Sequence, residues 1–301
     1  MVSNICEEYT CCTNLTDLCL PLSLKVSHTS VRVAAPTKTD DGLPVNFAPP
    51  DIPVPPGVAC SVPLFSHVFN DTVAHEYAYP DVAKLCGDHW SKVVLDLQCG
   101  VTPGGQYDRS LFVFLKGVNI FAGTSEEPNH SSVGPSWRVQ ADLSHYGVGL
   151  LAGAGSGSVE LDNIQSEGRD ALPHCVGSLR FFKATETYPP FEELSNHIVS
   201  LGTSYRNANG TNTNRGNNSL TAIVAALPKN TVRAELEIIL QNQAGEEGFW
   251  GRPKSAWRAA LVRIDGVPVG AISAYPIVFT GGYNRALWQP APGESKSKLP
   301  V

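Results

Sequence analysis

The chain has 301 residues, with 22 lysines and arginines against 28 aspartates and glutamates, and a formal net charge of −6 at pH 7. Its 27 glycines and 23 prolines are spread along the sequence, which argues against a bundle of long helices because both residues interrupt helices. The acidic balance offers no electrostatic footprint for nucleic acid, and no apolar run reaches the roughly 18 residues that span a bilayer. We therefore expect an all-β protein with neither a nucleic-acid partner nor a membrane span.

The cysteines and glycosylation motifs indicate an oxidising compartment. The 8 cysteines lack the paired spacings of zinc sites, so we predict disulfides and no metal. Cys86 and Cys99 flank the segment GDHWSKVVLDLQ and form the predicted local bridge. Asn-x-Ser/Thr sequons begin at Asn14, Asn70, Asn129, Asn209 and Asn217. These features predict that the protein is secreted or resides in the secretory or vacuolar pathway, although no signal peptide is visible at the start of the chain.

The first half of the chain changes from a proline-rich leader to strands. Residues 1–60 predict a cysteine-stapled leader and a surface strap, since each proline removes a hydrogen-bond donor from a sheet. In KVVLDLQ, residues 92–98, apolar and polar positions alternate as in a half-buried strand. Residues 110–121 predict two strands around a Lys-Gly turn, and residues 149–164 predict a strand pair around a Gly/Ser turn. Further strands are expected at WRVQADL and GSLRFFK.

The second half begins with a polar break at residues 186–219, where FEELSNHIVSL predicts a short helix. Strands resume in LTAIVAALP and VRAELEIIL, and Asp265-Gly266 predicts a hairpin. Many short strands separated by turns are typical of a β-sandwich or barrel. The break divides them into two lobes, residues 61–185 and 186–301.

Three motifs could carry chemistry. GAGSGS, residues 153–158, lacks the lysine of a phosphate loop and does not fit the Gly-x-Ser-x-Gly pattern, so a plain turn is the better interpretation. Asp108-Arg109 stands at the start of an apolar strand, where an acid is either a turn residue or a functional one. Glu246 and Glu247 precede Phe249 and Trp250, and carboxylates beside aromatic rings suit a sugar site.

Several strings between about residue 60 and 290 carry a resemblance to a known family. They are, in chain order, GGQYDRSLFVFLKGVNIFAGTSEEP, WRVQADLSHYGVGLLAGAGSGSVELDNI, LPKNTVRAELEIIL, EEGFW and IDGVPVGAISAYPIVFTGGYNRALWQP. In this order they resemble the peptide:N-glycanase A family of glycoamidases. The resemblance implies two antiparallel jelly-roll-like β-sandwich lobes. The second lobe is expected to be incomplete, because the family's chains continue past the final Trp-Gln-Pro string.

The resemblance also implies an activity and its residues. The family hydrolyses the amide that links N-acetylglucosamine to an asparagine side chain in N-glycopeptides and glycoproteins, without metal or cofactor. Asp108 matches the principal catalytic aspartate, as nucleophile or water activator, and Asp162 matches a supporting acid. The second-lobe acid is Glu247 or Glu246, because Gly248 separates them from the Phe-Trp pair. Arg109, Trp250 and Glu127 are the expected substrate-binding residues.

Two other functions stay open at this point. A jelly-roll relative could hold N-glycans without turnover, as a lectin-like binding protein. A structural domain of the cell surface would bind no glycan at all. Glycan release would indicate the glycoamidase, binding without release would indicate the lectin-like protein, and neither would indicate the structural domain.

Overall fold

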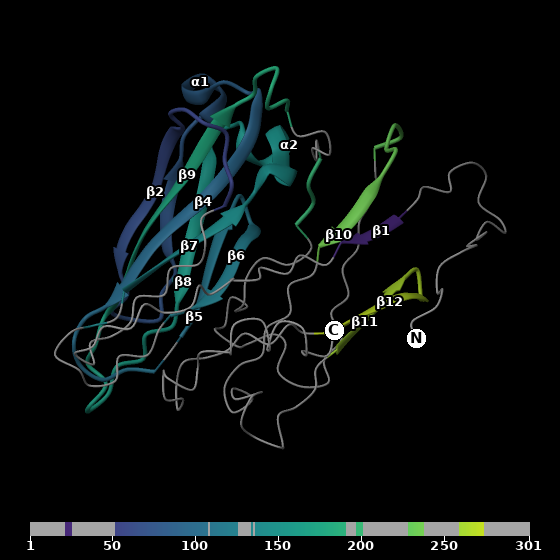
Figure 1. Cartoon of the computed structure of the whole chain (residues 1–301). Coiled ribbons are helices and arrows are strands. Elements are labelled where there is room, and N and C mark those ends of the chain that lie inside the picture. The colour runs from purple at the N-terminus through teal and green to yellow at the C-terminus, as the bar shows by residue number, and fades with distance from the viewer. Residues whose placement is uncertain are drawn as a thin grey trace, which may run out of the picture.

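The computed structural model of the chain describes residues 22–25, 52–107, 109–125, 134, 136–190, 197–200, 228–237 and 259–273. Eight of its strands form two four-stranded sheets that pack face to face (Figure 1). One sheet has the order β2-β9-β4-β7 and the other β3-β8-β5-β6. The strands are β2 (Cys60–Val68), β3 (His75–Tyr79), β4 (Trp90–Val101), β5 (Ser110–Leu115), β6 (Val118–Thr124), β7 (Ser136–Asp142), β8 (Gly155–Leu161) and β9 (Pro173–Lys183).

All pairings within these two sheets are antiparallel. Chain neighbours such as β2 and β3 or β4 and β5 lie in opposite sheets, so the chain crosses between layers repeatedly. Two four-stranded sheets connected in this way are a jelly roll. The predicted all-β sandwich is confirmed, and its last strand, β9, ends at Lys183.

The helices of the described residues are short. They are α1 (Val82–Cys86), the 3-10 turn η1 (Ser144–Tyr146) and α2 (Gly147–Leu151). Both α-helices lie at the same end of the sandwich (Figure 1). In the part of the chain that the structure describes, no helix has the length and apolarity to cross a membrane.

The core lies between the sheets and follows the predicted alternation. Val93, Leu95 and Leu97 of β4 are buried there, opposite Leu111 and Val113 of β5. The prediction of a half-exposed β4 is wrong, however, because Val94 and Asp96 on its other face are buried as well. Sequence alternation shows which residues enter the core, but it does not show what covers the outer face.

On the outer face of β4, Asp96 is 5% exposed and lies among cations. Arg138 Nε donates to its carboxylate at 2.8 Å, and Arg180 Nη1 lies 3.7 Å away. Burial alone raises the pKa of Asp96, but Arg138, with help from Gln140 and Arg180, outweighs burial and holds the pKa below its ordinary value. The main chain of Ile52 donates to Gln140 Oε1 at 2.8 Å. The described part of the proline-rich segment therefore contacts this face at Ile52, while the leader and strap over residues 1–60 stay a prediction.

Both predicted two-residue hairpins are confirmed. Lys116 and Gly117 join β5 to β6, and Asp265 and Gly266 join β11 (Ala259–Ile264) to β12 (Val267–Ser273). All four turn residues have positive φ angles, between 49° and 81°. A two-residue turn of this kind matches the twist of the strands that it connects, and glycine adopts it at little cost.

The strand pair predicted for residues 149–164 is wrong. Its first part belongs to helix α2, and the Gly/Ser segment opens β8, which pairs with β3 and β5 rather than with a hairpin partner. A Cβ atom on Gly157 would lie 2.3 Å from Tyr77 Cζ and 2.4 Å from the Phe114 carbonyl oxygen. The glycine here allows close packing inside a strand, a role that short sequence patterns do not separate from a turn.

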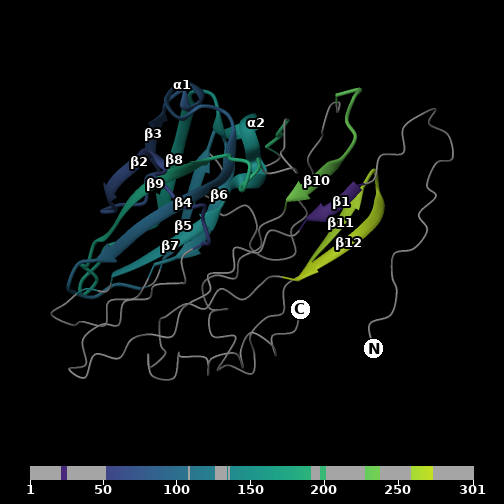
Figure 2. The same cartoon turned by 45° about the horizontal axis from the view of Figure 1, so that its top comes forward.

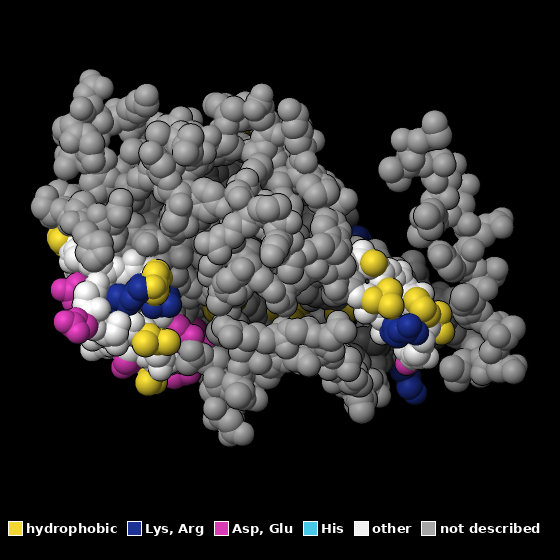
Figure 3. Space-filling model, turned by 90° about the horizontal axis from the view of Figure 1, so that it is seen from below, with side chains coloured by type: hydrophobic (Ala, Val, Ile, Leu, Met, Phe, Trp, Pro, Cys, Tyr) yellow, Lys and Arg dark blue, Asp and Glu magenta, His cyan; other side chains and the backbone are white. Residues whose placement is uncertain are grey.

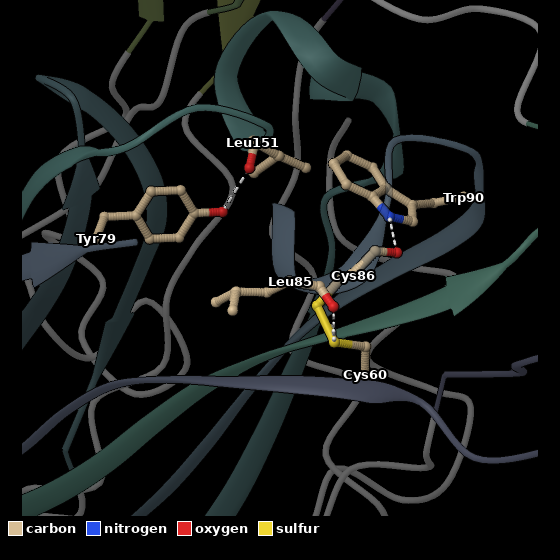
Figure 4. Close-up of a disulfide and its surroundings, with 6 residues drawn as sticks. All are labelled: Cys60, Tyr79, Leu85, Cys86, Trp90 and Leu151. Carbon is tan, nitrogen blue, oxygen red and sulfur yellow. Dashed lines mark hydrogen bonds between the residues drawn. A yellow bond between two sulfur atoms is a disulfide. The ribbon is translucent and has the colours of Figure 1, made fainter. Parts of the chain in front are cut away.

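The predicted Cys86–Cys99 bridge is also wrong. The disulfides in the described residues join Cys60 to Cys86 and Cys99 to Cys175. Cys86 ends α1, whereas Cys99 lies near the far end of β4, about 30 Å along an extended strand. Figure 4 shows the first bridge at the helical end, where Trp90 Nε1 donates to the Cys86 carbonyl at 3.3 Å. The second links directly opposed residues of β4 and β9.

Two short pairings lie outside the sandwich (Figures 1 and 2). One is the β11–β12 hairpin; the other joins β10 (Ala234–Glu237) to β1 (Leu22–Lys25) in parallel. β10 confirms a strand within VRAELEIIL, while LTAIVAALP lies outside the described residues. Of FEELSNHIVSL only residues 197–200 are described, and they are not helical. Most of the expected second lobe is outside the described ranges, so the two-lobe division stays a prediction.

Two histidines bridge the sheets at the end opposite the helices. His67 of β2 and His75 of β3 stack with ring centroids 4.0 Å apart. Burial, and then the neighbouring His75, lower the pKa of His67 from its ordinary 6.5, while Asp71 partly opposes the shift. In the folded protein His67 therefore prefers to be neutral.

We expect the free energy of unfolding to fall as the pH drops below 6.5 and through the lower pKa of folded His67. The unfolded chain takes up this proton first, so the stabilisation is complete above pH 6.5 and is lost in acid. Urea unfolding from about pH 7.5 to 5.5 measures the slope. His67→Gln should have a shallower slope than wild type, and identical slopes would contradict the assignment.

Candidate active site

Two predicted site residues meet at the end of the sandwich opposite the helices. β5 starts there and β8 ends there, and the two strands are hydrogen-bonded neighbours with Leu111 opposite Leu161. Arg109 directly precedes β5, and the half-buried Asp162 directly follows β8. The antiparallel register therefore brings together positions that are more than 50 residues apart in the chain.

The other predicted site residues are Asp108, Glu127, Glu246, Glu247 and Trp250. All five lie outside the described residues, so their roles stay predictions. Tyr107 and Arg109, the chain neighbours of Asp108, are both described. They define the point at which the chain enters β5.

Arg109 is anchored at its main chain and at its side chain. Its main-chain N–H donates to Ser125 Oγ at 2.8 Å, and its carbonyl accepts from the Ser125 main chain at 2.7 Å. Its Nη2 donates to Gln106 Oε1 at 2.8 Å. A guanidinium held in this way keeps a fixed direction, which is needed where a cation must act on one particular group.

Gln106 and Asn163 form a buried amide pair behind Arg109 that sequence reasoning missed. They are 3% and 1% exposed, and Gln106 Nε2 donates to Asn163 Oδ1 at 2.6 Å. Asn163 Nδ2 in turn donates to the Phe69 carbonyl at 2.8 Å. The Gln106 oxygen also accepts the N–H of Tyr107 at 2.9 Å. The pair fixes the main chain on both sides of the predicted site, because a buried amide that lost its partner would cost about 1–3 kcal/mol.

The sequence contained only a weak signal for this pair. Gln106 and Asn163 are the polar residues beside the two predicted aspartates, in GGQYDR and LDNI. Nothing in the sequence shows that two amides 57 positions apart are bonded to each other.

The loops that carry the two strand ends are joined by further hydrogen bonds. The Gly105 main chain donates to Asp170 Oδ1 at 3.2 Å, and Ala171 N donates to the Gly105 carbonyl at 3.1 Å. Arg169, next to Asp170, places its guanidinium carbon 3.1 Å from the centre of the Tyr107 ring. Figure 3 views the molecule from this end, where described basic side chains lie against hydrophobic ones, with acidic groups beside them.

This arrangement suits chemistry on a polar substrate. The entry to β5 and the exit from β8 bring the Tyr107 ring, the guanidinium groups of Arg109 and Arg169, and Asp162 to one end of the sandwich. Positioned carboxylates transfer protons or attack carbonyl carbons, and aromatic faces stack on sugars. Within the described residues, no three His, Cys, Asp or Glu side chains are placed to hold a metal ion.

The chain is similar in sequence to a curated protein. Peptide-N4-(N-acetyl-beta-glucosaminyl)asparagine amidase A of Prunus dulcis is 26% identical over 299 residues, covering 88% of this chain and 52% of that protein. The chain thus spans about half the length of this curated relative.

Solved structures give only weak likenesses. The empty turnip yellow mosaic virus and tomato aspermy virus structures are each 11% identical, with TM-scores of 0.24 and 0.25. Each match covers 50% of this chain and 92% of the viral chain. These scores are too low to support a conclusion.

The family model named peptide N-acetyl-beta-D-glucosaminyl asparaginase amidase A matches residues 48–300. This range includes the whole jelly roll, both described strand ends of the candidate site and the predicted acids of the second half. Because the match extends over most of the sequence, the chain belongs to the peptide N-acetyl-beta-D-glucosaminyl asparaginase amidase A family.

Proposed function

We propose that this protein is a glycoamidase that hydrolyses the amide between N-acetylglucosamine and the asparagine side chain of N-glycopeptides or glycoproteins. The observation that carries the proposal is the family match over residues 48–300, which includes the Asp-Arg step before β5 and the Asp162 end of β8. The two disulfides support an oxidising compartment of the secretory pathway, where such substrates occur.

In the proposed reaction, Asp108 attacks the amide carbon or removes a proton from the attacking water. The carbon–nitrogen bond breaks, and Glu247 or Glu246 gives the departing nitrogen a proton. If Asp108 is the attacking group, water then hydrolyses the anhydride that joins it to the substrate and frees Asp108. The products are an aspartyl peptide and a glycosylamine, which takes up water and releases ammonia. Asp162 orients the reacting groups, and Trp250 stacks on the core sugar with Glu127 beside it.

The described residues would support this step by positioning. Arg109 offers a fixed cation next to the charge that develops on the amide oxygen, and its direction is set by Gln106 and Ser125. Gln106 and Asn163 hold the two strand ends at a constant separation. Catalytic groups need such support because small displacements lower rates steeply.

The test is incubation of the purified chain with a defined N-glycopeptide, followed by mass spectrometry. Release should convert the glycosylated asparagine to aspartate, which is heavier than asparagine, and should free the intact glycan. Isothermal titration of the same glycopeptide measures binding separately. Binding without release would instead support the lectin-like function, and the absence of both would reject the proposal.

A further inference from the structure

Arg169 stands out because its guanidinium forms no ion pair with any carboxylate that the structure describes. Its guanidinium carbon lies 3.1 Å from the centre of the Tyr107 ring. No carboxylate or carbonyl in the described part of the chain accepts a hydrogen bond from its guanidinium. Arginines elsewhere in the sandwich are paired, as Arg138 is with Asp96. Arg169 is partly exposed, so its N–H donors are available to a ligand as far as the described residues are concerned.

The Arg169–Tyr107 stack is held in place by its two loops. Arg169 closes a tight turn in which its main-chain N–H donates to the Ser166 carbonyl at 2.9 Å. The neighbouring Asp170 accepts from Gly105, and Tyr107 donates its main-chain N–H to Gln106. These bonds fix the main chain at both residues, so ligand binding needs to order little of the backbone, which favours affinity.

The chemistry of the stack selects an anion with planar oxygens. A guanidinium binds a carboxylate through two parallel hydrogen bonds, and stacking on a ring leaves its edge free to do so. Tyr107 is 45% exposed, so the stack is open to solvent. Tyr107 directly precedes Asp108 in the chain, so the stack is next to the residue proposed to act on the amide.

We propose that Arg169, stacked on Tyr107, binds a carboxylate carried by the substrate near the scissile linkage, and so makes acidic glycopeptides preferred substrates. This inference rests on the proposed function. The carboxylate belongs either to an acidic residue beside the glycosylated asparagine or to an acidic sugar of the glycan. Both present the same group to the guanidinium.

The experiment compares three glycopeptides of otherwise identical structure. One is neutral, one carries an aspartate next to the glycosylated asparagine, and one carries an acidic sugar on a neutral peptide. For wild type at low salt, we expect kcat/KM for one acidic substrate to exceed that for the neutral substrate by about tenfold, as for one charge-assisted contact. The acidic glycopeptide that shows the higher kcat/KM identifies whether the carboxylate comes from the peptide or from the glycan.

Variants separate a specific contact from general electrostatics. Arg169→Gln should bring the acidic-to-neutral ratio close to one, and Arg169→Lys should restore only part of it, because lysine keeps the charge without the planar fork. Tyr107→Phe should keep the ratio, since the ring remains. Lys183→Gln is the matched control: it removes one positive charge from an exposed residue at the opposite end of β9. It should leave the ratio unchanged.

Binding measurements keep this test independent of turnover. The affinity of wild type and Arg169→Gln for the three glycopeptides is measured by titration calorimetry, and the acidic preference should appear there even if no glycan is released. An absence of release with intact acidic preference would reject the proposed function alone. Equal affinities and rates for all three substrates, or a ratio that survives in Arg169→Gln, would overturn the role of Arg169.

Discussion

Replacing Asp108 with asparagine is expected to lower the rate of glycan release by about 100- to 10,000-fold, the usual cost of losing a positioned general base. The substitution keeps the size and polarity of the side chain but removes its negative charge and its basicity. Glycopeptide affinity should survive, because the proposed sugar contacts come from other side chains such as Trp250. Initial rates and titration calorimetry, at matched folded fraction, measure the two quantities.

The control for this prediction is Asp88→Asn, which makes the same chemical change at an exposed position in the loop between α1 and β4. It should leave release unchanged. If Asp108 were only a turn residue paired with Arg109, its substitution would cost about 0–1 kcal/mol of stability and leave turnover nearly intact. Release at the wild-type rate in Asp108→Asn would therefore end the catalytic assignment.

Removing the Cys99–Cys175 disulfide is expected to lower the free energy of unfolding by about 4.5 kcal/mol, as chain entropy predicts for a bridge that closes a 76-residue loop. The bridge joins the central strands β4 and β9 and closes a loop that contains more than half of the jelly roll, so its loss frees that part of the chain in the unfolded state. Urea unfolding of the Cys99→Ala/Cys175→Ala double variant, followed by tryptophan fluorescence, measures the change.

The Cys60→Ala/Cys86→Ala double variant provides the comparison. Its bridge closes only 26 residues, and the same relation gives about 3.5 kcal/mol. We expect the Cys99–Cys175 pair to be the more costly loss by about 1 kcal/mol. An equal or reversed order would show that strain or residual structure, rather than loop length, sets the contribution of these bridges.

The strands and tight turns were predictable because their signals are local. Alternation placed Val93, Leu95 and Leu97 in the core, and Lys116-Gly117 and Asp265-Gly266 formed the hairpins that their dipeptides indicated. The turn predicted for the Gly/Ser segment is wrong because a glycine needed for close packing, such as Gly157, cannot be told in sequence from a glycine needed for a turn.

The candidate site was predictable only in part. The strings around Arg109 and Asp162 pointed to it through family resemblance, and the antiparallel register of β5 and β8 brings both residues to one end of the sandwich. The Gln106–Asn163 bond and the Arg169–Tyr107 stack were not foreseen. Each joins residues from separate loops, and neither type of residue carries a distinctive pattern of its own.

The sequence by itself therefore determined the β-rich class, the strand alternation, the hairpins and the family, because each depends on short-range pattern or on strings that remain readable in order. Only the tertiary structure decided the partners of the cysteines, the burial of Asp96 and the contacts of Arg169. In a jelly roll the chain crosses between sheets at almost every turn, so residues that touch are often many tens of positions apart. Their contact depends on how whole strands stack, and no local pattern contains that information.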